Sequence, residues 1–275
     1  MKKIVLVLLC YWAFTPLHAQ TIPDSTKPLS IGQVKTFYSS VLKEKRTLNI
    51  YLPPKYDSTK TYPVLYLLDG SMDEDFIHIT GLLQFFNLMF NMPETIIVGI
   101  ANVDRKRDFT FKTEKKELLK ENPAMGNSAP FIRFLETELV PLVQQNFKSN
   151  GVNYLLGQSL GGLLATEVLV KKPALFSHYL IVSPSLWWDD ESLLKLVKQQ
   201  APKMPAQVKY IYISAGKKEH PVMQKDARAL YDLLKPIAGK DRKVDFQLMP
   251  DNHATILHNS IYEALLKLFP YKEPK

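Results

Sequence analysis

One short stretch in the middle of the chain constrains the fold more than any other. The apolar run 154–156 breaks at Gly157, and a helical pattern begins directly after Ser159. This is the pattern of a strand, a tight turn and a helix, with Gly-x-Ser-x-Gly at the turn. Gly157 and Gly161 remove the Cβ atoms that would clash in such a turn, so Ser159 is lifted clear with a helix N-terminus behind it. The motif alone is weak evidence, and its surroundings decide what it means.

Strands alternate with helices on both sides of this turn. The nearly continuous apolar runs 62–68 and 95–100 are typical of strands buried on both faces of a sheet. The segments 34–40 and 47–52 flank a polar turn and predict an antiparallel hairpin at the sheet edge. Because alternating strands and helices form parallel βαβ units, we expect one mostly parallel, doubly wound α/β sheet. Further strands are predicted near 179–183, 208–214 and 244–248, and helices near 77–90, 128–143, 192–199, 221–237 and 254–268.

The N-terminus has the pattern of a secretory signal peptide. Two lysines precede the apolar run 4–14, which is too short for a permanent membrane span, and Ala19 is a plausible cleavage point. We therefore expect residues 1–19 to be removed during export to the periplasm or the medium. Residues 20–33 then form an extended N-terminal segment, and residues 34–275 form a single domain. No later apolar stretch is long enough to predict a stable membrane span.

Cysteine content and net charge exclude several classes of protein. Cys10 is the only cysteine, so the mature chain has no disulfide, no cysteine nucleophile and no thiolate metal site. The formal net charge of +8 drops by two when the N-terminal lysines are lost, and the chain stays basic. A basic charge suits an anionic substrate, but it also suits an ordinary basic exported protein. No nucleic-acid-binding motif accompanies it, so we expect no nucleic-acid partner.

Candidate catalytic residues follow the predicted strands. In doubly wound sheets the ligand lies beyond the carboxyl ends of the strands. Glu219 follows the strand 208–214, and His253 follows the strand 244–248. A serine hydroxyl needs a base, most often a histidine, which is itself held by a carboxylate. The order Ser159, Glu219, His253 therefore predicts a nucleophile, an acid and a base, and this chemistry needs no metal or organic cofactor.

Three other residues compete for the acid and base roles. Asp226 is expected inside the following helix and is too far along the chain to be the acid. Asp251 is too close to His253 to come from the preceding strand. His258 is the rival base, but its five-residue spacing from His253 places the two on different helical faces, which also argues against a helical zinc pair.

The tetrahedral intermediate of an ester needs two donors for its developing negative charge, and backbone N–H groups can supply them. Leu160 follows the nucleophile and is the first candidate. The second is expected in the loop after the strand 62–68, where the N–H of Ser71 is preferred. The sequence Asp69-Gly70 is also typical of an ordinary tight turn, so both interpretations stay open.

Three further segments carry a family resemblance: 62–70, 97–108 and 183–188. With the serine turn, they resemble the Putative esterase (esterase D-like) family of α/β-hydrolases, which includes siderophore esterases, feruloyl esterases and mycolyltransferases. The Arg-x-Arg-Asp and Ser-Pro-Ser-Leu-Trp-Trp segments are similar to the siderophore-hydrolase branch, and the resemblance runs from about residue 34 to 269. It implies the α/β-hydrolase fold, and it implies the roles named above for the following residues: Ser159, Glu219, His253, Ser71 and Leu160. It also places Arg107, Trp187 and Trp188 near the pocket as substrate-binding residues.

The chain departs from the family pattern at one position. Many members have a histidine before the nucleophile, where this chain has Gln158. We expect this change to alter local hydrogen bonding without abolishing hydrolysis. Of Trp187 and Trp188, we expect one ring to be buried and one to line the cleft, since core packing is the alternative role. Arg105 and Arg107 could equally be surface or salt-bridged arginines.

These observations together predict an exported serine carboxylic ester hydrolase. Its substrate would be a small-molecule or glycan-linked ester, with siderophore-type and aromatic, feruloyl-like esters as candidates. Two alternatives stay open: an acyltransferase on the same fold, and a non-catalytic protein that binds anionic aromatic ligands through its arginines and tryptophans. The sequence predicts no oligomeric state.

Overall fold

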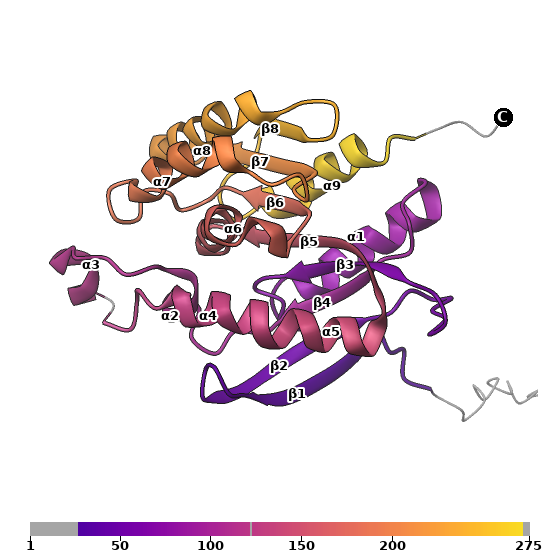
Figure 1. Cartoon of the computed structure of the whole chain (residues 1–275). Coiled ribbons are helices and arrows are strands. Elements are labelled where there is room, and N and C mark those ends of the chain that lie inside the picture. The colour runs from indigo at the N-terminus through magenta and orange to yellow at the C-terminus, as the bar shows by residue number, and fades with distance from the viewer. Residues whose placement is uncertain (1–26, 122, 272–275) are drawn as a thin grey trace, which may run out of the picture. The chain divides into compact units, whose positions relative to one another are not determined.

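The computed structural model describes residues 27–121 and 123–271 (Figure 1). The chain from Ile31 onward forms one compact unit by itself. The predicted signal peptide, residues 1–19, and residues 20–26 of the predicted extended segment 20–33 lie outside the described residues. The boundaries of a domain over residues 34–275 stay a prediction.

The described residues build an eight-stranded sheet in the order β1-β2-β4-β3-β5-β6-β7-β8. Strand β2 is antiparallel to both of its neighbours, β1 and β4, and every other neighbouring pair is parallel. This is the α/β-hydrolase fold, mostly parallel with an antiparallel N-terminal hairpin, and the predicted fold is confirmed. The strands are β1 (Gln33–Ser39), β2 (Glu44–Tyr51), β3 (Tyr62–Leu67), β4 (Ile96–Ile100), β5 (Ser149–Gln158), β6 (His178–Val182), β7 (Tyr210–Gly216) and β8 (Lys243–Met249).

Helices cover both faces of the sheet, which explains the continuous apolar runs of its central strands. In β3, Val64 and Tyr66 point into one hydrophobic layer, and Leu65 and Leu67 point into the other. The helices α1 (Phe76–Met89) and α9 (Ile256–Leu268) pack on the second layer (Figure 1). The first layer is covered by α4 (Ser128–Phe134), α5 (Val140–Phe147), α6 (Leu160–Lys171), α7 (Ser192–Gln200) and α8 (Pro221–Leu234).

The long segment between β4 and α4 contains two short helices. These are α2 (Arg105–Phe109) and α3 (Lys116–Glu121). A π-helical turn, Leu135–Leu139, joins α4 to α5, so residues 128–147 run as one helical segment. Single 3₁₀ turns occur at Pro173–Leu175, Ala201–Lys203 and Lys235–Ile237. Within the described part of the chain, no helix combines the length and apolar character needed to cross a membrane.

Candidate active site

The turn between β5 and α6 holds Ser159 in an unusual backbone conformation. Its φ of 59° and ψ of −118° lie in a region that residues other than glycine rarely adopt. A Cβ atom on Gly157 would lie 2.4 Å from the carbonyl oxygen of Gly161, so only glycine fits where strand and helix approach each other. The close approach lifts the Ser159 side chain above the carboxyl ends of the strands, as the motif predicted.

The structure brings Ser159, His253 and Glu219 together from three separate loops. The Oγ atom of Ser159 lies 3.0 Å from Nε2 of His253, and Nδ1 of His253 lies 3.2 Å from Oε1 of Glu219. Glu219 follows β7, and His253 follows β8. The Glu219 side chain is fully buried, whereas 46% of the His253 side chain is exposed. A substrate can therefore reach the serine and the histidine, while the carboxylate is shielded behind them.

The surroundings of Glu219 favour its ionised form. Burial raises the pKa of this carboxyl, but hydrogen bonds from His253 and Ser183 outweigh that effect and hold the pKa below its ordinary value. An ionised Glu219 accepts the Nδ1–H of His253, and this leaves the Nε2 lone pair directed at the serine hydroxyl. The arrangement suits a histidine that takes up a proton from Ser159.

Two serines that sequence reasoning missed complete this network. Ser183 follows β6 with a φ of 42°, and its buried hydroxyl donates to Oε2 of Glu219 at 2.6 Å. The same hydroxyl lies 3.2 Å from Nδ1 of His253. The hydroxyl of Ser185 lies 3.2 Å from Oγ of Ser159. Ser183 directly follows the carboxyl end of β6 and Ser185 lies two residues further on, and this position of the Ser-Pro-Ser segment was the available signal.

Gln158 connects the serine turn to the histidine loop. Its side-chain amide donates to the backbone carbonyl of His253 at 2.6 Å. The glutamine therefore restrains the backbone that carries His253.

A second group of polar side chains lies beside Ser159, around Asp69. The guanidinium of Arg105 binds this carboxylate with two contacts, Nε to Oδ1 at 2.6 Å and Nη2 to Oδ2 at 2.9 Å. Asn102 also donates to Oδ1 of Asp69 at 2.7 Å. Nη2 of Arg105 also donates to the carbonyl oxygen of Gln158 at 3.3 Å, so this ion pair contacts the end of the strand that leads to Ser159.

The cleft above Ser159 has a volume of about 380 Å³. Three carboxylates line it, and only Asp69 is bound by Arg105. The immediate surroundings of Ser159 are therefore acidic, although the whole chain is basic. The lining residues are Asp69, Glu74, Asp75, Arg105, Gln158, Ser159 and His253.

The three residues predicted to bind substrate do not line the cleft above Ser159. Arg107 is held by Asp108 at 2.7 Å and by Glu44 at 2.7 Å, and it does not line the cleft. Trp188 is fully buried, and its indole N–H donates to the carbonyl of Phe111 at 2.9 Å. Trp187 is 37% exposed but is not part of the cleft lining. Of the two arginines, Arg105 is the one that lines the cleft above Ser159.

The two predicted oxyanion donors lie on different elements, Leu160 directly after Ser159 and Ser71 in the loop after β3. Leu160 is the first residue of α6, where a backbone N–H has no partner within the helix. The N–H of Ser71 donates to Oε2 of Glu74 at 3.3 Å, so a substrate oxygen must displace this carboxylate to reach the donor.

The rival acids have other partners. Asp226 is buried in α8, and its Oδ1 lies 3.4 Å from Nζ of Lys225. Asp251 accepts a hydrogen bond from Asn259 at 2.9 Å. Of these two carboxylates and Glu219, only Glu219 hydrogen-bonds to His253.

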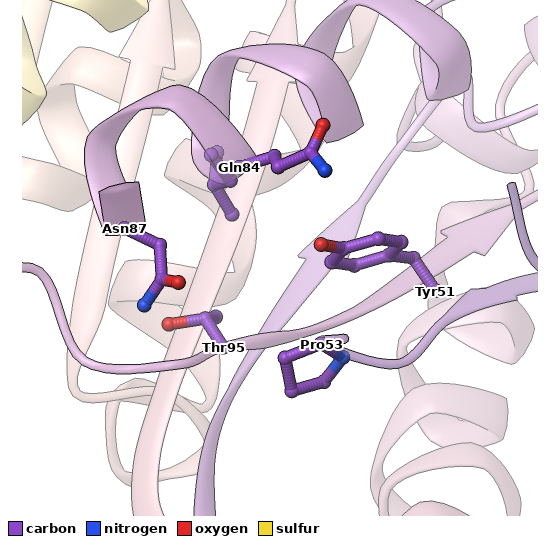
Figure 2. A pocket seen from close by; sticks show the side chains of 6 residues that line it. Tyr51, Pro53, Gln84, Asn87 and Thr95 are labelled. Carbon is purple, nitrogen blue, oxygen red and sulfur yellow. The ribbon is translucent and has the colours of Figure 1, made fainter. Parts of the chain in front are cut away.

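A separate small pocket lies at the start of β4, the end of that strand away from the cleft (Figure 2). It lies between α1, the end of β2 and the segment that leads into β4, and its volume is about 10 Å³. This space is near the minimum for one water molecule and cannot hold an ester. The side chains that line it are Tyr51, Pro53, Leu83, Gln84, Asn87 and Thr95.

Comparison with known proteins identifies the family. Residues 39–253 match the model of the family described as "Putative esterase". The chain belongs to this family. The esterase is 29% identical over 254 residues to the ferri-bacillibactin esterase BesA of Bacillus subtilis (strain 168). The aligned region covers 81% of this chain and 84% of BesA.

Solved structures agree with this assignment. The IroE-like serine hydrolase from Shewanella oneidensis has a TM-score of 0.78 and 33% identity, covering 86% of this esterase and 80% of that chain. The BES protein from Bacillus cereus has a TM-score of 0.77 and 26% identity, covering 89% and 97% respectively. The protein is therefore a serine-type carboxylic ester hydrolase with the α/β-hydrolase fold, as the sequence predicted.

Proposed function

We propose that this esterase is exported and that it cleaves esters with Ser159 as nucleophile, His253 as base and Glu219 as acid. One observation carries the catalytic part of the proposal: the continuous contacts from Ser159 Oγ to His253 Nε2 at 3.0 Å and from His253 Nδ1 to Glu219 Oε1 at 3.2 Å. Export is supported by the pattern of residues 1–19, a basic tip followed by a short apolar run.

The reaction follows from the positions of these groups. His253 takes the proton of Ser159 while the serine oxygen attacks the ester carbonyl. The N–H groups of Leu160 and Ser71 hold the resulting oxyanion, after Glu74 has moved away from Ser71. His253 then returns its proton to the departing alcohol, and water releases the acyl group by the same route. Buried, ionised Glu219 stabilises the imidazolium that exists between these proton transfers.

A siderophore-type or aromatic ester is the proposed substrate class. The relative BesA is named as a ferri-bacillibactin esterase, and the Shewanella structure is described as IroE-like. The acidic cleft also restricts the charge of the substrate, because Glu74 and Asp75 line the same cleft as Ser159, where the ester carbonyl would react. They repel negative charge there, so we expect an ester that is neutral around its scissile bond to react faster than a matched ester with a carboxylate beside it.

Substitution of the nucleophile tests the catalytic assignment. Ser159→Ala should lower the kcat for p-nitrophenyl acetate by roughly 10⁴- to 10⁶-fold, because a triad without its nucleophile retains little beyond binding and oxyanion stabilisation. The same variant should lose labelling by a fluorophosphonate. Unchanged hydrolysis would exclude Ser159 as the nucleophile.

A matched pair of substitutions tests the acid. Glu219→Gln should lower kcat by orders of magnitude, since the histidine loses its negative partner. Asp226→Asn should leave kcat within a few-fold, because Asp226 does not contact His253. Equal, minor losses in both variants would show that another group acts as the acid.

Substrate class and export need separate measurements. A panel of simple, feruloyl and catecholate trilactone esters, the last with and without ferric iron, will rank kcat/KM across the candidates. N-terminal sequencing of the protein recovered from outside the cytoplasm of an expressing bacterium should find Gln20 first. A chain that still begins at Met1 and stays in the cytoplasm would contradict export.

A further inference from the structure

Two histidines that the catalytic network does not use face each other beside the cleft. His78 lies on α1 and His258 lies on α9, two helices that pack against each other (Figure 1). Their Nδ1 atoms are 3.4 Å apart. The ring centroids are 5.6 Å apart and the ring planes are tilted by 43°, so the rings meet through these nitrogens and are not stacked in parallel.

A carboxylate fixes which nitrogen of His78 is free. Oδ1 of Asp75 lies 3.1 Å from Nε2 of His78. An ionised carboxylate only accepts, so Nε2 of His78 carries the hydrogen and Nδ1 presents its lone pair towards His258. In metal sites, a histidine ligand almost always donates its second N–H to such an outer carboxylate or carbonyl.

The separation of the two facing nitrogens matches that of two ligands on one metal ion. Zinc binds imidazole nitrogen at about 2.0–2.1 Å in tetrahedral geometry, which places two such nitrogens about 3.3–3.4 Å apart. We propose that His78 and His258 form a binding site for a divalent transition metal such as Zn²⁺, with Asp75 as the outer partner that orients His78.

This site is separate from the catalytic base but adjoins the cleft. Nδ1 and Nε2 of His253 are both engaged, with Glu219 and Ser159, whereas Asp75 is part of the cleft lining. A bound ion would therefore add positive charge at the rim of an acidic cleft. His258 is exposed and His78 is partly exposed, so solvent has access to both rings.

The donor set determines the class of ion. Neither part of the described chain contains a group of three or more His, Cys, Asp or Glu residues arranged to hold a metal, so this ion takes two protein ligands and completes its shell with water. Imidazole ligands suit zinc, nickel and copper, whereas magnesium and calcium prefer oxygen. The site should thus bind Cu²⁺ more tightly than Ni²⁺ or Zn²⁺, and it should not bind Mg²⁺.

Calorimetric titration of the untagged full chain with ZnCl₂ tests the proposal, with MgCl₂ as the comparison ion. We expect one saturable zinc site per chain and no magnesium binding. His78→Asn and His258→Asn should each weaken zinc binding roughly tenfold or more, since each removes one of two ligands. Asp75→Asn should weaken it about 10- to 100-fold, the usual effect of losing an outer partner.

Two control variants distinguish this site from other histidines. His220 is exposed at the start of α8, so His220→Asn should leave zinc affinity unchanged. His253→Asn should also leave it unchanged, which would exclude zinc capture by the catalytic histidine. Absence of saturable zinc binding would overturn the proposal, and so would binding that survives both His78→Asn and His258→Asn. Either result would mean that His78 and His258 form only a hydrogen bond between their rings and no metal site. Because the altered side chains are exposed or partly exposed, circular dichroism should show every variant folded.

Discussion

The buried hydroxyl of Ser183 offers the sharpest test of how Glu219, the proposed acid, is held. It donates to Oε2 of Glu219 at 2.6 Å, while Oε1 faces His253 at 3.2 Å. Ser183→Ala removes the donor and leaves one carboxylate oxygen without this partner inside the protein. The substitution leaves Ser159 in place, and the lost hydroxyl also lies 3.2 Å from Nδ1 of His253.

The expected loss follows from the strength of a hydrogen bond to a charged group. Such a bond contributes about 1.5–3 kcal/mol, and each 1.36 kcal/mol lost from transition-state stabilisation slows the reaction about tenfold. A loss of roughly 10- to 100-fold in kcat/KM is expected, because Glu219 keeps its bonds to His253 and to the backbone of Gly216. The loss should fall on kcat, since the carboxylate matters most when His253 is protonated.

Ser214→Ala is a matched control. Ser214 lies in the neighbouring strand β7, is equally buried and hydrogen-bonds to Ser260 at 2.6 Å, away from Glu219. Steady-state kinetics on a p-nitrophenyl ester should show a kcat close to that of the parent for this control. A Ser183→Ala enzyme within twofold of the parent, or a Ser214→Ala enzyme that loses as much activity, would refute the positioning role of Ser183.

Three further expectations concern stability. Because the pKa of Glu219 is lowered in the fold, its carboxylate stabilises the fold at pH values above the ordinary carboxyl pKa, and this contribution is lost as pH falls through the depressed pKa. Urea unfolding should therefore show that the difference in unfolding free energy between the parent and Glu219→Gln narrows from pH 7 to pH 3. Asp69→Ala removes the carboxylate partner of Arg105 and should cost about 2–3 kcal/mol in the same assay, below the value for a fully buried pair because a third of the Arg105 side chain is exposed. A loss under 0.5 kcal/mol would contradict a structural role for this pair. Gly157→Ala should lower the free energy of unfolding by about 1–3 kcal/mol or more, and lower the melting temperature, because the added Cβ would lie 2.4 Å from a backbone oxygen. An unchanged melting temperature would show that the turn relaxes to accept the methyl group.

The basic charge of the chain was a poor guide to the site. The sequence charge of +8 suits an anionic substrate, yet the cleft is lined by Asp69, Glu74 and Asp75 with a single arginine. Composition sums charges over the whole chain, whereas the field at the nucleophile depends on which few side chains the loops place there.

Sequence alone determined the order of strands and helices, the serine turn and the family. Periodicity and turn glycines are local properties, so the buried strand 62–67 and the turn at Ser159 could be predicted without any tertiary contact. The topology of a doubly wound sheet then places the ends of β5, β7 and β8 at one edge, which is why the positions of Glu219 and His253 after strands predicted that both lie near Ser159.

Only the tertiary structure decided which polar side chains meet at that edge. Arg105 and Arg107 are two residues apart in the short helix α2 and so point in different directions, and the packing of this helix turns Arg105 towards Asp69 and Arg107 towards Glu44. Tertiary packing likewise places the hydroxyl of Ser183 against the carboxylate of Glu219. These contacts join loops that are distant in the chain, and their geometry depends on backbone conformations that no local pattern specifies.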